Sequence, residues 1–100
     1  MSVYAYVRIK PGANCFQDMN FYEWPPSQYS EKIKNFIGVD DDTVFVAEKW
    51  IKSGGGVNWH CEAKGAGEIG GDYRNGGIIV KGGDSVELLT PLYGYKLEIP

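Results

Sequence analysis

Alternation of apolar with polar residues predicts a β-strand at the start of this chain. In residues 2–10 the apolar side chains fall on one face and the aromatic and basic side chains fall on the other: Val3, Ala5, Val7 and Ile9 against Tyr4, Tyr6, Arg8 and Lys10. A period of two is typical of a strand that packs one face on a core and turns the other outward. Pro11 and Gly12 end this strand.

Two segments in the middle of the chain also have the composition of strands. Residues 43–51 carry apolar groups on both faces, which favours an interior position in a sheet. Residues 57–63 follow a Ser-Gly-Gly-Gly turn and can pair back on the preceding strand as a hairpin. In that arrangement Val57, Trp59 and Cys61 share one side.

The last quarter of the chain predicts a second hairpin and a closing strand. Residues 77–81 and 85–89 flank Gly82-Gly83-Asp84, a strong hairpin pattern. After the break at Thr90-Pro91, residues 92–99 predict a strand with four apolar or aromatic side chains on one face: Tyr93, Tyr95, Leu97 and Ile99.

Residues 27–38 are the segment with helical periodicity. Ser27 fits an N-cap, Gly38 fits the C-terminal stop, and an apolar stripe lies between them: Tyr29, Ile33, Phe36 and Ile37. Because a helix of this length is not stable in isolation, we expect it to pack on the sheet. Residues 13–26 have no clean period and predict an irregular loop. The whole pattern predicts one α+β domain over residues 1–100, with about six mostly antiparallel strands in a curved or barrel-like sheet and one short helix packed on it.

Composition and charge narrow the possible partners. Apolar residues make up 43% and charged residues 23% of the 100 residues, which argues against disorder. The net charge of −3, with no cluster of Lys or Arg, argues against nucleic-acid binding and favours, if anything, a basic partner surface.

No segment approaches the roughly 18 apolar residues of a membrane helix. The N-terminus also lacks the order of a signal peptide, so we expect a cytoplasmic protein without membrane contact.

The few reactive side chains do not form a recognisable catalytic or metal motif. His60 and Cys61 are neighbours on a predicted strand, so their side chains point to opposite faces and cannot act as a nucleophile–base pair. Cys15 could meet His60 only through the fold. Two cysteines and one histidine are too few for a typical zinc site, so we expect no metal and no cofactor. In a cytoplasmic protein, Cys15 and Cys61 are expected to be free thiols that act as small buried apolar groups.

The glycine-rich segment 64–77 carries the alternative function. Gly65-Ala66-Gly67-Glu68-Ile69-Gly70 matches G-x-G-x-x-G, but the residues that follow cannot form the helix that a dinucleotide site requires. A hairpin connection is therefore the simpler interpretation. The alternative is a site for a small anionic ligand, or a minor enzyme, in which backbone amides and a cation hold the anion. Its residues would be His60, Gly65, Gly67, Asp72, Tyr73 and Arg74, with the Glu62 carboxylate also available nearby.

Aromatic and acidic side chains on the predicted surface indicate a docking face. Tyr, Trp and Arg are the residue types that dominate interface hot spots. Asp40-Asp41-Asp42 does not continue into a calcium loop and predicts either a solvated turn or a contact for a basic partner. The candidate protein-binding residues are Tyr4, Tyr6, Arg8, Trp24, Asp40, Asp41 and Asp42. The competing interpretation is that the helix or the long loop covers the tyrosines of the first strand.

The hypothesis that these observations favour is a small protein-binding module that is not an enzyme. Such a module would act as an inhibitor, an adaptor or a subunit of a homo-oligomer. A short, acidic chain without a motif also has the profile of phage-encoded inhibitors of host machinery, which is a likeness of profile alone. Catalysis is the less favoured interpretation.

Overall fold

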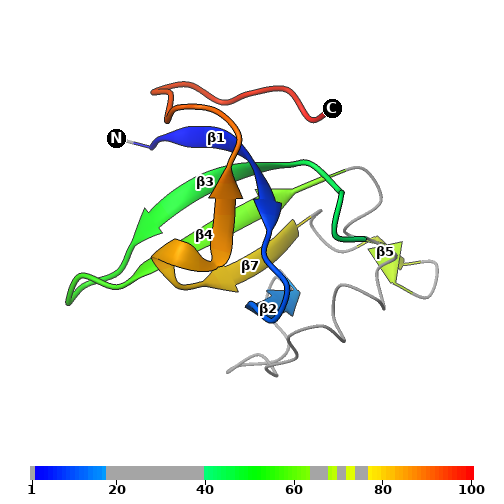
Figure 1. The fold of residues 1–100 in the computed structure, drawn as a ribbon, viewed down its shortest axis with the longest axis horizontal. Coiled ribbons are helices and arrows are strands. Elements are labelled where there is room, and N and C mark those ends of the chain that lie inside the picture. Colours follow the sequence, from blue (N-terminus) through cyan, green and yellow to red (C-terminus); the bar gives the residue numbers. More distant parts are fainter. Residues whose placement is uncertain (1, 18–39, 64–67, 70–71, 74–76) are drawn as a thin grey trace.

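Strands dominate the described part of the chain (Figure 1). The computed structural model describes residues 2–17, 40–63, 68–69, 72–73 and 77–100. One sheet contains six strands: β1 (Tyr4–Ile9), β2 (Asn14–Gln17), β3 (Phe45–Ile51), β4 (Val57–Glu62), β7 (Gly77–Lys81) and β8 (Val86–Leu88). The remaining elements are an antiparallel pair, β5 (Glu68–Ile69) with β6 (Asp72–Tyr73), and a 3-10 turn, η1 (Gly83–Ser85).

Two short connections require the six-stranded sheet to curl. The strands lie in the order β2-β7-β4-β3-β1-β8, and every pair is antiparallel. β1 and β2 lie four positions apart in this order, about 19 Å in a flat sheet, yet only residues 10–13 join them. A turn with a 3.3 Å hydrogen bond from Ala13 N to Lys10 O shortens that span further. Residues 82–85 make an equally wide step from β7 to β8, so the sheet curls into a half-barrel (Figure 1).

The inner face of the half-barrel holds the hydrophobic core. On β1, Ala5, Val7 and Ile9 are buried there, while Tyr4, Tyr6 and Arg8 are half-buried on the outer face, as the alternation predicts. Most core side chains are small or β-branched, and Phe45 and Trp59 are the largest of them. The core cluster consists of Ala5, Val7, Ile9, Ala13, Cys15, Phe45, Ala47, Trp59, Cys61, Ala63, Ile78, Val80 and Val86.

The structure confirms the antiparallel, curved sheet and the first predicted hairpin. β3 lies between β4 and β1, which is the interior position that its two apolar faces predict. β4 pairs back on β3 from Val57 opposite Ile51 to Glu62 opposite Val46. Trp59 and Cys61 are buried, and Val57 packs against the same core.

The second predicted hairpin, between residues 77–81 and 85–89, is wrong. β7 pairs with β2 and β4, whereas β8 pairs with β1. Gly82 adopts a φ of 100° and donates its N–H to Val57 O (2.9 Å), and the Ser85 hydroxyl donates to Lys81 O (2.5 Å). Ser85 N donates to Gly82 O (3.1 Å), the bond that closes η1, and this turn leads the chain to the far edge of the sheet. A glycine-rich linker suits a 3-10 turn as well as a hairpin, so local composition did not separate the two.

The predicted closing strand over residues 92–99 is also wrong. The described residues after β8 form a single bridge, Tyr93 opposite Tyr4, and no further strand. Leu89 N still donates to Tyr6 O, but Tyr6 N donates to the Thr90 hydroxyl rather than to a backbone carbonyl (3.1 Å). Pairing resumes at Tyr93, two residues later than an unbroken ladder would place it. The break at Thr90-Pro91 therefore bulges the chain off the edge of β1.

Other predictions fall on residues that the structure places differently or does not describe. Residues 14–17, predicted as irregular, form β2, because Cys15 enters the core and the strand pairs along β7. The helix predicted over residues 27–38 lies outside the described residues. Within the residues that the structure does describe, η1 is the only helical element. No helix in this part of the chain has the length and apolar character needed to cross a membrane.

We expect the turn between β1 and β2 to depend on glycine. Gly12 has a φ of 79°, and no heavy atom lies within 4 Å of the position that a Cβ would take. Gly12→Ala therefore adds backbone strain without a clash, and should lower the free energy of unfolding by about 1–2 kcal/mol in urea denaturation. Gly83→Ala is the matched control, because its Cβ would make an ordinary 3.7 Å contact with Val57 at an unstrained φ. Equal losses in both variants would contradict this account.

Candidate functional site

The outer face of the sheet brings polar and aromatic side chains from three strands into register. Tyr4 of β1 lies opposite Glu48 of β3, which lies opposite His60 of β4. In the adjacent row, Tyr6, Val46 and Glu62 are aligned in the same way. Because side chains on one face at directly opposed positions are close neighbours, these two rows form one continuous surface.

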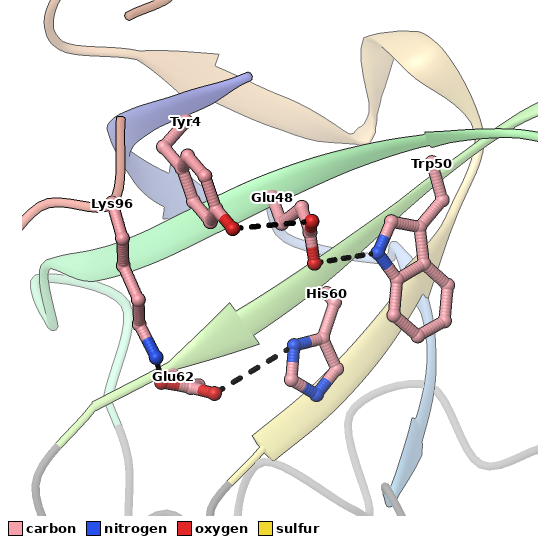
Figure 2. Close-up of polar contacts among 6 residues, drawn as sticks. All are labelled: Tyr4, Glu48, Trp50, His60, Glu62 and Lys96. Atoms are coloured by element: carbon pink, nitrogen blue, oxygen red, sulfur yellow. Dashed lines mark hydrogen bonds and ion pairs between the residues drawn. The ribbon is translucent and has the colours of Figure 1, made fainter. Parts of the chain in front are cut away.

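A depression of about 220 Å³ opens on this surface. We call it the outer-face pocket. Its lining residues come from β1, β3, β4 and the C-terminal segment, defined here as residues 89–100: Tyr4, Val46, Glu48, Trp50, His60, Glu62 and Lys96. Figure 2 shows two groups of polar contacts in it, one around Glu48 and one around Glu62.

Two aromatic donors hold the Glu48 carboxylate in place. Trp50 Nε1 donates to Glu48 Oε1 (2.8 Å), and the Tyr4 hydroxyl donates to Glu48 Oε2 (3.2 Å) (Figure 2). Partial burial of Glu48 opposes its ionisation, but hydrogen bonds from Ser2, Trp50 and Tyr4, together with the nearby His60, outweigh that effect. The pKa of Glu48 therefore lies below its ordinary value of 4.5. The carboxylate is both charged and fixed at neutral pH.

The second group of contacts connects β4 to the C-terminal segment. The His60 ring stacks on the Trp50 indole, with centroids 5.0 Å apart and planes within 1°. His60 Nδ1 lies 3.8 Å from Glu62 Oε1, and Lys96 Nζ lies 3.3 Å from Glu62 Oε2 (Figure 2). The pocket therefore has an aromatic wall, two carboxylates and one ammonium group, so the carboxylates are in excess when His60 is neutral.

The C-terminal segment covers part of the outer face. It follows the edge of β1 through the Tyr93–Tyr4 bridge (Figure 1). The Tyr6 hydroxyl then donates to Glu98 O (2.9 Å). Tyr4 and Tyr6 are both half-buried as a result. The competing interpretation in the sequence analysis was that the helix or the long loop covers these tyrosines. Among the described residues, it is the C-terminal segment that covers them.

The other predicted protein-binding residues lie outside the pocket. Arg8 faces Glu87 across β1 and β8, with 3.8 Å between the charged groups, at an exposed site. Asp40, Asp41 and Asp42 are exposed in a turn. Asp40 Oδ1 accepts hydrogen bonds from Asp42 N (3.1 Å) and the Thr43 hydroxyl (2.9 Å), so this turn has a local structural cause.

Of the residues predicted for the alternative ligand site, the structure places the side chain of His60, together with that of the nearby Glu62. Its candidates Gly65, Gly67 and Arg74 lie outside the described residues, as does Trp24 of the predicted protein-binding residues. Asp72 and Tyr73 are placed as the backbone of β6, which pairs with β5 and supports the hairpin interpretation of this segment.

Sequence reasoning missed much of the pocket. The unpredicted lining residues are Val46, Glu48, Trp50 and Lys96. The alternation in residues 43–51 places the first three on one face, and antiparallel pairing with the first strand would have set them beside Tyr4. No pattern in the sequence pointed to Lys96, because its position depends on the bulge at Thr90-Pro91.

The cysteines and the histidine lie on opposite faces of the sheet. Cys15 and Cys61 are free thiols and fully buried in the core, whereas His60 lines the outer-face pocket. Burial, with a smaller contribution from Cys15, raises the pKa of the Cys61 thiol far above its ordinary value. No group of three His, Cys, Asp or Glu side chains among the described residues is arranged to hold a metal ion.

Comparisons with protein-family models, with curated proteins and with solved structures found no match to this chain.

Both thiols should be unreactive in the native protein. A thiol reacts as the thiolate; complete burial denies solvent access to both Cys15 and Cys61, and it also disfavours ionisation of Cys61. With Ellman's reagent at pH 8, we expect no reaction within minutes in buffer and two equivalents in guanidinium chloride. A rapid native reaction of either cysteine would contradict the placement of that residue in the core.

The lowered pKa of Glu48 predicts a pH-dependent contribution to stability. A carboxyl whose pKa is lower in the folded state stabilises the fold above its unfolded pKa, and this contribution is lost as the pH falls through the folded pKa. Glu48→Gln should therefore lower the free energy of unfolding at pH 7, and the difference from wild type should shrink as the pH falls below 4.5.

Urea denaturation of both proteins at pH 7 and pH 3 measures this difference. Glu87→Gln is the control, because its ion pair is exposed and should be worth less than about 1 kcal/mol at either pH. A Glu48→Gln effect that is the same at both pH values would exclude ionisation of Glu48 as its cause.

Proposed function

We propose that this chain is a small protein-binding module that docks through the outer-face pocket on a basic surface of its partner. An inhibitor, an adaptor or a homo-oligomer subunit would each act in this way, and the phage-inhibitor profile of the sequence fits the first. The observation that carries the proposal is an open pocket in which two carboxylates lie beside an exposed tryptophan.

The size of the pocket supports a side chain as its occupant. Sites that enclose a small molecule measure about 300–1,000 Å³, whereas this pocket measures about 220 Å³ and lies on the surface of a sheet. That volume suits the end of one long side chain. The rest of a partner would then lie on the surrounding outer face.

The chemistry of the pocket supports a basic partner. Glu48 and Glu62 are opposed by the single ammonium of Lys96, so an anion would meet a surplus of carboxylate. Trp50 keeps 38% of its surface exposed next to these carboxylates. Tryptophan is among the residues that contribute most to interfaces.

The pocket offers little support for catalysis. Its lining residues include no serine, threonine or cysteine, so the tyrosine hydroxyl is its one hydroxyl group. That hydroxyl already donates to Glu48. The anion-binding alternative at residues 64–77 stays a prediction, because its candidate side chains other than His60 and the nearby Glu62 are not described.

Capture of a partner from a lysate of the native source, with variants matched on one strand, tests the proposal. Trp50→Ala removes the exposed ring of the pocket, whereas Ile51→Ala removes a 72% exposed apolar side chain on the opposite face of β3. We expect wild type and Ile51→Ala to retain a specific protein that Trp50→Ala loses by at least tenfold, as for an interface hot spot. Equal retention by Trp50→Ala, or a monomeric protein that captures nothing, would contradict the proposal.

A further inference from the structure

The outer-face pocket already contains one cation from its own chain. Lys96 reaches Glu62 from the C-terminal segment, and its side chain remains 59% exposed while the Glu62 side chain is 20% exposed. An exposed ion pair of this kind is worth little, typically below about 1 kcal/mol. Lys96 therefore shows that a cation fits beside Glu62, although this ion pair holds it only weakly.

The Glu48 carboxylate is prepared to accept a further hydrogen bond. Its oxygens accept hydrogen bonds from Trp50 and Tyr4, and Ser2 also donates to the carboxylate. A carboxylate has about four acceptor positions, so about one remains for a further donor. Because the two aromatic donors fix the carboxylate, little conformational entropy remains to be lost when a ligand binds it.

A guanidinium group suits this setting better than an ammonium group. It is planar, weakly hydrated and carries five N–H donors, so it can lie on an aromatic ring while it donates to carboxylate oxygens. The pocket supplies the fixed Glu48 carboxylate, the Glu62 carboxylate and the partly exposed Trp50 ring, one face of which is already stacked on His60. A lysine ammonium would be attracted by the same carboxylates, but it would gain less from contact with the aromatic ring.

We infer that the outer-face pocket binds an arginine side chain of the partner, and that Lys96 is an internal competitor for its carboxylates. This inference rests on the proposed docking function and names the group that the pocket recognises. Arginine entry displaces the Lys96 ammonium from Glu62, so the C-terminal segment lowers the affinity of the pocket until a partner replaces that contact.

The test uses the full chain labelled with ¹⁵N and three small probes: the N-acetyl N-methylamides of arginine, lysine and citrulline. Citrulline is the neutral analogue of arginine. We expect the arginine probe to shift the Trp50 indole N–H resonance in a saturable way, the lysine probe to bind at least threefold more weakly, and citrulline to bind undetectably. Lysine or citrulline binding as strong as arginine would overturn the inference.

Two charge-matched variants test the role of Lys96. Lys96→Met should bind the arginine probe about two- to fivefold more tightly, the factor expected for release of an exposed ion pair. Lys10→Met removes the same charge from an exposed position outside the pocket and should leave the affinity unchanged. Equal effects of both variants, or no effect of Lys96→Met, would exclude internal competition.

The outcomes for this inference and for the proposed function are distinguishable. Capture of a partner that depends on Trp50, without any response to the arginine probe, would overturn the arginine site and leave the docking function intact. A saturable response to the arginine probe without any captured partner would overturn the docking function and leave the arginine site intact. Where the arginine probe binds, Glu62→Gln, checked for folding by its ¹⁵N spectrum, should weaken that binding.

Discussion

The curl of the sheet is the constraint on which the rest of this structure depends. Residues 10–13 and 82–85 each join strands that lie four positions apart in the sheet, and a flat sheet would put those strands beyond their reach. A tight curl leaves little room on the inner face, which explains why so many core residues there are alanine, valine or cysteine. Two of the large aromatic side chains fit inside, Phe45 and Trp59. Tyr4, Tyr6 and Trp50 lie on the outer face.

The same geometry explains how an outward-curving face comes to carry a pocket. An outward-curving face spreads its side chains apart, so its strands alone do not enclose much space. Here the bulge at Thr90-Pro91 lifts the C-terminal segment off the edge of β1, and Lys96 reaches back from it to Glu62. The pocket is thus formed by a regular sheet on one side and an irregular segment on the other. This arrangement puts the fixed Glu48 carboxylate in the same pocket as the exposed Lys96 ammonium.

The structural features that depend on local alternation could be predicted from the sequence, whereas those that depend on pairing between distant segments could not. The outward position of Tyr4, Tyr6 and His60 and the burial of Cys61 follow from a period of two, and the structure confirms them. The partner of residues 86–88 does not follow from any local pattern, because the backbone of β8 could satisfy its hydrogen bonds on β7 or on β1. The pocket was missed for the same reason. Tyr4, Glu48 and His60 are 44 and 12 residues apart in sequence, and the strand register alone brings them together.

The polar network of the outer face contributes little to stability. Cross-strand pairs on an exposed face are worth roughly 0.2–1 kcal/mol each, and the ion pair of Glu62 with Lys96 is partly open to solvent. Apolar residues at the same positions would stabilise the sheet at least as well, as Val46 does. What the network provides instead is a charged carboxylate held by Tyr4 and Trp50 in a fixed orientation at the surface. Fixed charge beside an exposed ring reduces the cost of ordering when a cationic group binds, which is the physical basis of the proposed docking function.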